Sequence, residues 1–288
     1  MIGALLSFSM MAVSIRELSR GGMSIFEILA IRSGVALLVM VVLLAFRPEL
    51  RPLTRTRRIG LHALRNIVHY IAQYSWAVAL TILPFAMVFA LEFTMPAWTA
   101  LLAVWLLSEK LTPSRIGVVV FGLIGVLVIL RPGLADFNPA AMLVLFAAFG
   151  YAVIMIATKK LTTTESTFSI IFWMALIQFP LSLAGSNPAN FLNMSAGQLL
   201  PAIAIGVGGL TSHSCLSNAF RAGDATLVVP LDFMRIPLIA VVGWAFYGES
   251  LDIFVLIGAL IIVAGVVWNL RSEHTRAGDS LAKPAFPD

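Results

Sequence analysis

Charged residues are scarce in this chain, and their scarcity is the first guide to its class. Only 11% of the 288 residues are charged, 60% are hydrophobic, and the mean hydropathy is +0.97. Soluble domains carry about 25% charged residues, so this composition is typical of a protein that crosses a membrane several times. The basic residues are not interleaved with aromatic ones, and we therefore expect the lipid bilayer, not nucleic acid, as the large partner.

Cysteine and the common catalytic motifs are almost absent as well. The single Cys215 can form neither an internal disulfide nor a multi-cysteine metal site, and the four histidines are scattered. The sequence contains no H-E-x-x-H, no G-x-S-x-G and no G-x-x-x-x-G-K-[ST] segment. These motifs supply metal ligands, an activated serine and a phosphate-binding loop, respectively. We predict a protein that is not an enzyme, uses no cofactor or metal, and is not driven by ATP.

Ten apolar segments recur along the chain. A hydrocarbon core of about 30 Å needs about 20 helical residues, so the predicted fold class is an all-α polytopic membrane protein with ten transmembrane helices. The first segment is predicted to be a membrane helix rather than a signal peptide, because no basic stretch precedes it and no small-residue cleavage site follows it. The segments cover about residues 1–15, 24–46, 59–81, 84–107, 114–130, 139–158, 166–185, 198–220, 225–247 and 252–270.

Lysine and arginine fall mostly on one side of this arrangement. Only three lie in the odd-numbered loops, namely Arg16, Arg20 and Arg131. Because cytoplasmic loops retain the excess of basic residues, both termini are predicted to be cytoplasmic. The thirteen in the even-numbered loops and the C-terminal end are Arg47, Arg51, Arg55, Arg57, Arg58, Lys110, Arg115, Lys159, Lys160, Arg221, Arg271, Arg276 and Lys283.

The chain repeats itself at an offset of about 140 residues. Leu91-Glu92-Phe93 aligns with Leu231-Asp232-Phe233, Glu109-Lys110-Leu111 with Glu249-Ser250-Leu251, and Gly125 with Gly265. Each copy would hold five helices, and an odd number of helices makes the second copy enter the membrane from the opposite side. Inverted repeats of this kind build the two related gates of many secondary transporters.

The paired segments FALEFTMPAWTALLAVWLLSEKLTPSRIGVVVFGLIGVLVILRP and VPLDFMRIPLIAVVGWAFYGESLDIFVLIGALIIVAGVVW resemble the two copies of the EamA-type domain of the drug/metabolite transporter superfamily. The resemblance implies a 5+5 inverted repeat around a central cavity in a bacterial inner membrane, moving small organic solutes. It places the first repeat at residues 1–132, the second at 139–270 and a polar cytoplasmic tail at 271–288. One departure is Ser108-Glu109, where the family usually has Gly-Glu.

A polar stripe runs along the predicted helix at residues 59–81. At 100° per residue, Arg65, His69, Gln73 and Trp76 fall on one face. A polar face on a membrane helix contacts either protein or water. The stripe therefore predicts either hydrogen bonds to neighbouring helices or the lining of a cavity, where Arg65 attracts the solute, His69 and Gln73 orient it, and Trp76 stacks on it.

Two acidic residues occupy corresponding places in the two copies. Glu92 lies four residues before Pro96, which removes a helical hydrogen bond beside it, and Asp232 lies between two prolines. Three roles remain open for this pair, namely solute contact, proton coupling, and partnership with an arginine. Asp232 and Arg235 stand three residues apart on one helix and are placed to form an ion pair.

Ser217 and Asn218, in the eighth segment, are candidates for either solute contact or hydrogen bonding between helices. The function predicted is secondary transport by alternating access of a small organic solute, planar and aromatic or anionic, such as a riboflavin-like vitamin or an amino acid. The alternatives are export of amino acids, polyamines or drugs, and, in other classes, an intramembrane enzyme or a receptor without transport. Both a monomer and a homodimer are compatible with the sequence.

Overall fold

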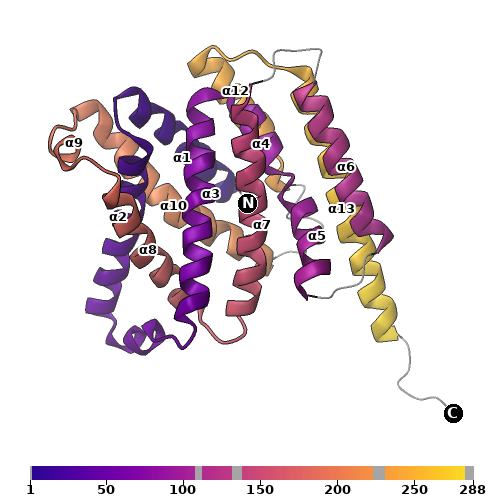
Figure 1. Cartoon of the computed structure of the whole chain (residues 1–288), viewed down its shortest axis with the longest axis horizontal. Coiled ribbons are helices and arrows are strands. Elements are labelled where there is room, and N and C mark those ends of the chain that lie inside the picture. Colours follow the sequence, from indigo (N-terminus) through magenta and orange to yellow (C-terminus); the bar gives the residue numbers. More distant parts are fainter. Residues whose placement is uncertain (1, 108–111, 132–137, 223–230, 283–288) are drawn as a thin grey trace.

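The computed structural model describes residues 2–107, 112–131, 138–222 and 231–282, without the side chains of residues 107, 213, 216–222, 273 and 276–282. The described residues form helices and contain no strand, which confirms the predicted all-α class (Figure 1). The helices are α1 Ile2–Arg20, α2 Ile25–Phe46, η1 Pro48–Thr54, α3 Ile59–Ile82, α4 Phe85–Glu92, α5 Met95–Leu107, α6 Pro113–Leu130, α7 Ala140–Leu161, α8 Thr167–Ala184, α9 Pro188–Leu192, α10 Ala196–Ala222, α12 Arg235–Tyr247 and α13 Ile253–Ala282.

Seven helical segments among the described residues are long and apolar enough to cross a membrane. One of them, Phe85–Leu106, joins α4 and α5, and the others lie in α1, α2, α6, α7, α8 and α13. Two shorter apolar helices occur in α10 and α12. The polar helix α3 is not among the seven, so the predicted total of ten spans is not confirmed by length and composition. Large apolar side chains such as Leu38, Trp105 and Phe246 are exposed, as on a lipid-facing surface.

Each half of the chain packs its first helix against a helix of the other half. The first helix of the first half, α1, packs along α10, and the corresponding helix of the second half, α7, packs along α3. This swap of partners is what a two-fold relation between two like halves produces. Figure 1 shows α2 and α8 at one end of the molecule and α6 and α13 at the other, and both pairs are in contact.

Helices α6 and α13 approach each other closely at two glycines. A Cβ atom on Gly125 would lie 2.7 Å from the carbonyl oxygen of Gly258, and a Cβ atom on Gly258 would lie 2.7 Å from that of Gly125. Real Cβ atoms do not approach backbone oxygens so closely, so only glycine allows this contact. Small residues at such crossings let dispersion forces act between backbones in lipid.

Both halves break a helix at the same place. Helix α4 ends at Glu92 and α5 begins at Met95, and the corresponding turn at 233–234 separates Asp232 from α12, which begins at Arg235. Pro96 stands in the first turn of α5, where its missing N–H would otherwise bond residue 92, as expected from the sequence. The two acidic residues therefore lie beside interrupted helices, and their sequence neighbours Leu91, Phe93 and Phe233 belong to the main hydrophobic core.

Candidate functional site

Four of the predicted site residues meet at the two helix breaks, and we name them the central cluster: Trp76, Glu92, Asp232 and Arg235. The indole Nε1 of Trp76 donates to Glu92 Oε2 at 2.8 Å. Arg235 Nη2 donates to Asp232 Oδ2 at 2.7 Å, so the ion pair predicted from their spacing is confirmed. Arg235 Nη1 lies 4.0 Å from Glu92 Oε1. One guanidinium group thus stands between carboxylates from the two halves of the chain.

Aromatic rings enclose this guanidinium. Phe93 and Phe233, which correspond in the two repeats, stack on each other with their centroids 3.9 Å apart and an angle of 23°. The Arg235 guanidinium carbon lies 4.3 Å from the ring centroid of Phe8, 4.9 Å from that of Phe93 and 5.6 Å from that of Phe89. Cation–π attraction at these distances stabilises the arginine, and the apolar rings strengthen nearby charge interactions by excluding water.

The backbone at the breaks explains why the carboxylates need partners. Glu92 is the last residue of α4, where the negative end of the helix dipole disfavours a second negative charge. The Trp76 N–H and the Arg235 guanidinium offset that repulsion. Asp232 stands in the corresponding place, three residues before α12 begins, and Arg235 is its partner.

Several polar atoms of the central cluster have no hydrogen-bond partner in the described part of the chain. They are Nε and Nη1 of Arg235 and Oδ1 of Asp232, and the two residues are only 5% and 8% exposed. An unpaired buried polar atom costs about 1–3 kcal/mol, and more when it is charged. Buried polar groups are nearly always hydrogen-bonded, so these atoms call for a partner such as an ordered water or a ligand.

The other residues of the α3 stripe do not join the central cluster. Arg65 donates to Thr158 Oγ1 and to Asn66 Oδ1, each at 2.8 Å, and so fastens α3 to α7. His69 Nδ1 lies 2.7 Å from the amide nitrogen of Gln178 in α8. The alternative of hydrogen bonding between helices therefore describes both residues in this structure, and a solute role for them stays a prediction.

Gln73 is buried, with 4% exposure, on the same helix as Trp76. The side chains of Ser217 and Asn218 lie outside the described residues, so the structure does not test their predicted role. No group of three or more metal-ligating side chains occurs among the residues that are described.

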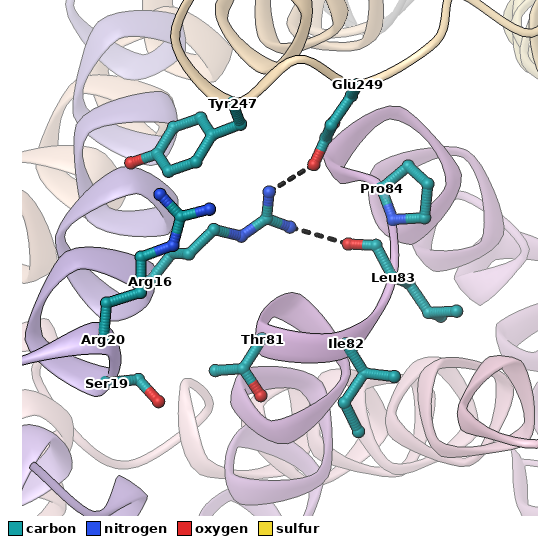
Figure 2. Close-up of a pocket in the computed structure, with 9 residues that line it drawn as sticks. All are labelled: Arg16, Ser19, Arg20, Thr81, Ile82, Leu83, Pro84, Tyr247 and Glu249. Carbon is teal, nitrogen blue, oxygen red and sulfur yellow. Dashed lines mark hydrogen bonds and ion pairs between the residues drawn. The ribbon is translucent and has the colours of Figure 1, made fainter. Parts of the chain in front are cut away.

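A second feature is a pocket of about 390 Å³ where the ends of α1, α3 and α12 converge (Figure 2). Its centre is Arg16, which forms an ion pair with Glu249. Arg16 also donates to the carbonyl oxygens of Leu80, at 2.9 and 2.7 Å, and of Leu83, at 2.6 Å. The other Glu249 oxygen accepts from the backbone N–H of Phe85 at 2.9 Å. Glu249 therefore caps the start of α4, a helix of the other half of the chain.

Sequence reasoning missed Arg16, because it stands at the end of the first apolar segment and counts there as a loop residue. One signal was available in the sequence: Arg16 is one of only three basic residues on the side of the membrane that has few of them. Its exposure is only 7%, and its guanidinium carbon lies 3.4 Å from the ring centroid of Phe85. This arginine is therefore part of the protein interior.

The opposite end of α3 is fastened by a different acid. Glu165, in the turn between α7 and α8, accepts from Thr56 Oγ1 at 2.6 Å and from Ser169 Oγ at 2.9 Å, and lies 3.9 Å from His62 Nε2. Burial raises the pKa of Glu165, but the hydrogen bonds from Thr56 and Ser169 and the nearby His62 and Arg58 outweigh it, so the pKa lies below its usual value.

Apolar helices in two like halves, with broken helices that meet at a charged cluster, are typical of membrane transport proteins built from repeats. The model of the EamA-like transporter family matches residues 1–131 and 138–271. The chain belongs to that family, and thus to the drug/metabolite transporter superfamily, whose members are small-molecule transporters of membranes rather than enzymes.

Named relatives agree with this assignment. A protein of Rickettsia felis named S-adenosylmethionine uptake transporter is 31% identical over 219 residues, which are 76% of this chain and 74% of that protein. A Brucella anthropi protein named riboflavin transporter is 30% identical over 252 residues, 85% of this chain and 88% of that protein. A crystal structure at 19% identity has a TM-score of 0.61 and covers 96% of each chain, which shows the shared fold.

Proposed function

We propose that this chain is a secondary transporter that moves a small planar aromatic solute across a bacterial inner membrane by alternating access. The observation that carries the proposal is the central cluster, where a helix break from each half brings a carboxylate and a phenylalanine into one place. Solute sites of inverted-repeat transporters lie at the repeat interface and are formed by interrupted helices.

The composition of the central cluster favours a planar solute without net negative charge. Phenylalanine rings surround the charges with apolar surface, and two carboxylates face one guanidinium. Arg65, the residue expected to attract an anionic or carbonyl group of the solute, donates to Thr158 and Asn66 instead. The relatives are named for S-adenosylmethionine and riboflavin, and both molecules carry a flat heteroaromatic ring with a polar arm. Their shared chemistry supports the same class of solute here.

The proposed topology has ten spans with both termini in the cytoplasm. The first repeat occupies residues 1–132, the second 139–270, and 271–288 form a cytoplasmic extension. Its support is the basic-residue distribution together with the exchange of helix partners between α1, α10, α3 and α7. In this topology the Arg16 pocket faces the outside of the cell and Glu165 the cytoplasm.

We propose that the solute site is formed by Trp76, Glu92, Asp232 and Arg235. Glu92 is also the candidate for proton coupling, since its carboxylate is shared between a neutral donor and a distant cation. Transport by Glu92→Gln that keeps the pH dependence of the wild type would remove it from that role.

The test is counterflow in proteoliposomes against a panel of riboflavin, S-adenosylmethionine, amino acids and polyamines. We expect flux of planar aromatic solutes, reduced about tenfold or more by Trp76→Phe, which keeps the ring but loses the hydrogen bond to Glu92. Trp105→Phe is the matched control, because Trp105 is 80% exposed. Binding without flux would show a receptor, and chemical change of the solute an enzyme; either result would overturn the proposal.

A further inference from the structure

We infer that Glu92 and Arg235 together recognise one edge of the solute ring, on which an N–H donor stands next to a nitrogen or carbonyl acceptor. The inference rests on the proposed function and specifies its solute. Adenine has such an edge in its amino group and neighbouring ring nitrogen, and the flavin ring has one in its ring N–H and flanking carbonyls.

The first support is that a donor and an acceptor stand close together without bonding each other. Arg235 Nη1 and Glu92 Oε1 are 4.0 Å apart, beyond hydrogen-bond reach, and Nη1 has no hydrogen-bond partner among the described residues. The other oxygen of Glu92 is held by Trp76. One acceptor and one donor thus stand side by side, each free to bond a third group.

The second support is that the donor is held in a fixed direction. Asp232 binds Arg235 through Nη2, and the rings of Phe8 and Phe93 lie against the guanidinium group. A guanidinium fixed in this way presents its remaining N–H groups along set lines. Asp232 therefore acts as a positioning residue for Arg235.

The third support comes from comparing the two repeats. The residue that corresponds to Arg235 at the offset of 140 is Met95, and both begin a helix after an equivalent break. The first half makes its break with a methionine, so the break itself does not require an arginine. The backbone break therefore does not account for the charge at position 235, which is left to serve Asp232, Glu92 and, in our inference, the solute.

Other solute groups fit this pair poorly. A carboxylate would accept from Arg235 but be repelled by Glu92, and a simple amine would pair with Glu92 but leave Nη1 unbonded. An edge with both a donor and an acceptor satisfies both residues. A site built to bond a polar edge rejects an analogue without it, because its own buried groups are then left unpaired.

The test measures binding of two matched pairs of probes to the purified protein by titration calorimetry. Adenosine is compared with purine riboside, which lacks the amino donor and adds no bulk. Riboflavin is compared with 3-methylriboflavin, whose ring N–H is blocked. For whichever ring the wild type binds, we expect the altered probe to bind roughly ten- to a hundredfold more weakly.

Two variants assign the discrimination to the residues. Both probe pairs differ in the N–H donor that Glu92 would accept, so Glu92→Gln should bring the two members of a pair to within about threefold. Arg235→Met, which copies position 95, should instead weaken both members of a pair by a similar factor, because every probe keeps the acceptor. Thermal unfolding verifies that the variants are folded. Trp105→Phe should keep the wild-type discrimination. Glu92→Gln serves alone if Arg235→Met does not fold.

The outcomes separate this inference from the proposed function. If the wild type binds and transports a planar probe but does not discriminate within either pair, the inference is overturned and the transport proposal stands. If discrimination survives in Glu92→Gln, or if Arg235→Met leaves the binding of both members unchanged, the edge is read elsewhere and the inference is again overturned. If no planar probe binds or crosses, both proposals fall.

Discussion

The ion pair between Arg16 and Glu249 holds together one end of the helix bundle, and its contribution to stability can be measured directly. The two residues are 233 positions apart and join α1 to the loop between α12 and α13. Their side chains are 8% and 13% exposed. Glu249→Gln keeps the shape of the side chain and its ability to accept from the Phe85 N–H, and removes the charge.

The magnitude follows from the state in which Arg16 is left. Removal of one partner from a buried ion pair costs about 3–5 kcal/mol, because the other charge stays buried. Arg16 keeps its bonds to the carbonyl oxygens of Leu80 and Leu83, so the lower end of that range applies, about 3 kcal/mol. For a chain of this size, that loss corresponds to a fall in melting temperature of about 6–12 °C.

The assay is thermal unfolding in detergent, followed by tryptophan fluorescence, on a double-mutant cycle. We expect Glu249→Gln and Arg16→Met each to lower the melting temperature, and the double variant to lose little beyond either single change, because no buried charge remains unpaired. Arg20→Gln is the control, since its side chain is 58% exposed.

Two results would refute this reasoning. One is a Glu249→Gln variant that melts within about 1 °C of Arg20→Gln, which would mean that water or a neighbour replaces the lost charge. The other is a double variant whose loss equals the sum of the two single losses, which would mean that the residues stabilise the protein independently.

Three further substitutions test other contacts by the same unfolding measurement. Gly125→Ala should lower the melting temperature by several degrees, because the added Cβ would lie 2.7 Å from the Gly258 carbonyl oxygen, and an unchanged value would contradict that packing. Asp232→Asn should destabilise the protein by about 3 kcal/mol by leaving Arg235 unpaired, and Arg235→Met should partly restore it. Glu165→Gln should destabilise at pH 7, and its difference from the wild type should vanish as the pH falls through the lowered pKa of Glu165; a difference that persists below that pKa would contradict the role of the ionised form.

The repeat was the most informative feature of the sequence. Alignment of Leu91-Glu92-Phe93 with Leu231-Asp232-Phe233 predicted that two carboxylates stand at corresponding points, and the structure stacks the adjoining Phe93 and Phe233 rings. The pairing of Asp232 with Arg235 followed from a spacing of three residues. Both inferences needed only local geometry and the equivalence of two copies.

The α3 stripe shows where that kind of reasoning stops. Helical periodicity places Arg65, His69 and Trp76 on one face of the helix. It does not predict which neighbouring helices that face contacts. In the structure Arg65 bonds α7, His69 bonds α8, and Trp76 bonds the end of α4. Residues of one stripe thus bond three different helices, because α3 contacts α4, α7 and α8.

The contact between Arg16 and Glu249 was beyond the sequence for a related reason. Neither residue has an opposite charge three or four positions away that would mark it as paired; Glu17 directly follows Arg16 in the sequence. The contact between Arg16 and Glu249 depends on how α1 and α12 pack together. Spacing rules apply within one element. Contacts between elements far apart in the chain need the packed structure.

The central cluster combines a symmetric backbone with an asymmetric set of charges. Each half supplies a carboxylate at its break, but only the second half supplies an arginine, since Met95 stands at the equivalent place in the first. Asp232 holds that arginine at 2.7 Å, so Glu92 is the acid without a close cation. Under the proposed function, the oxygen of Glu92 that Trp76 does not hold would take either a proton or a donor on the solute. The two would then compete for the same oxygen, and such competition is a physical basis for coupling solute movement to proton movement in the opposite direction.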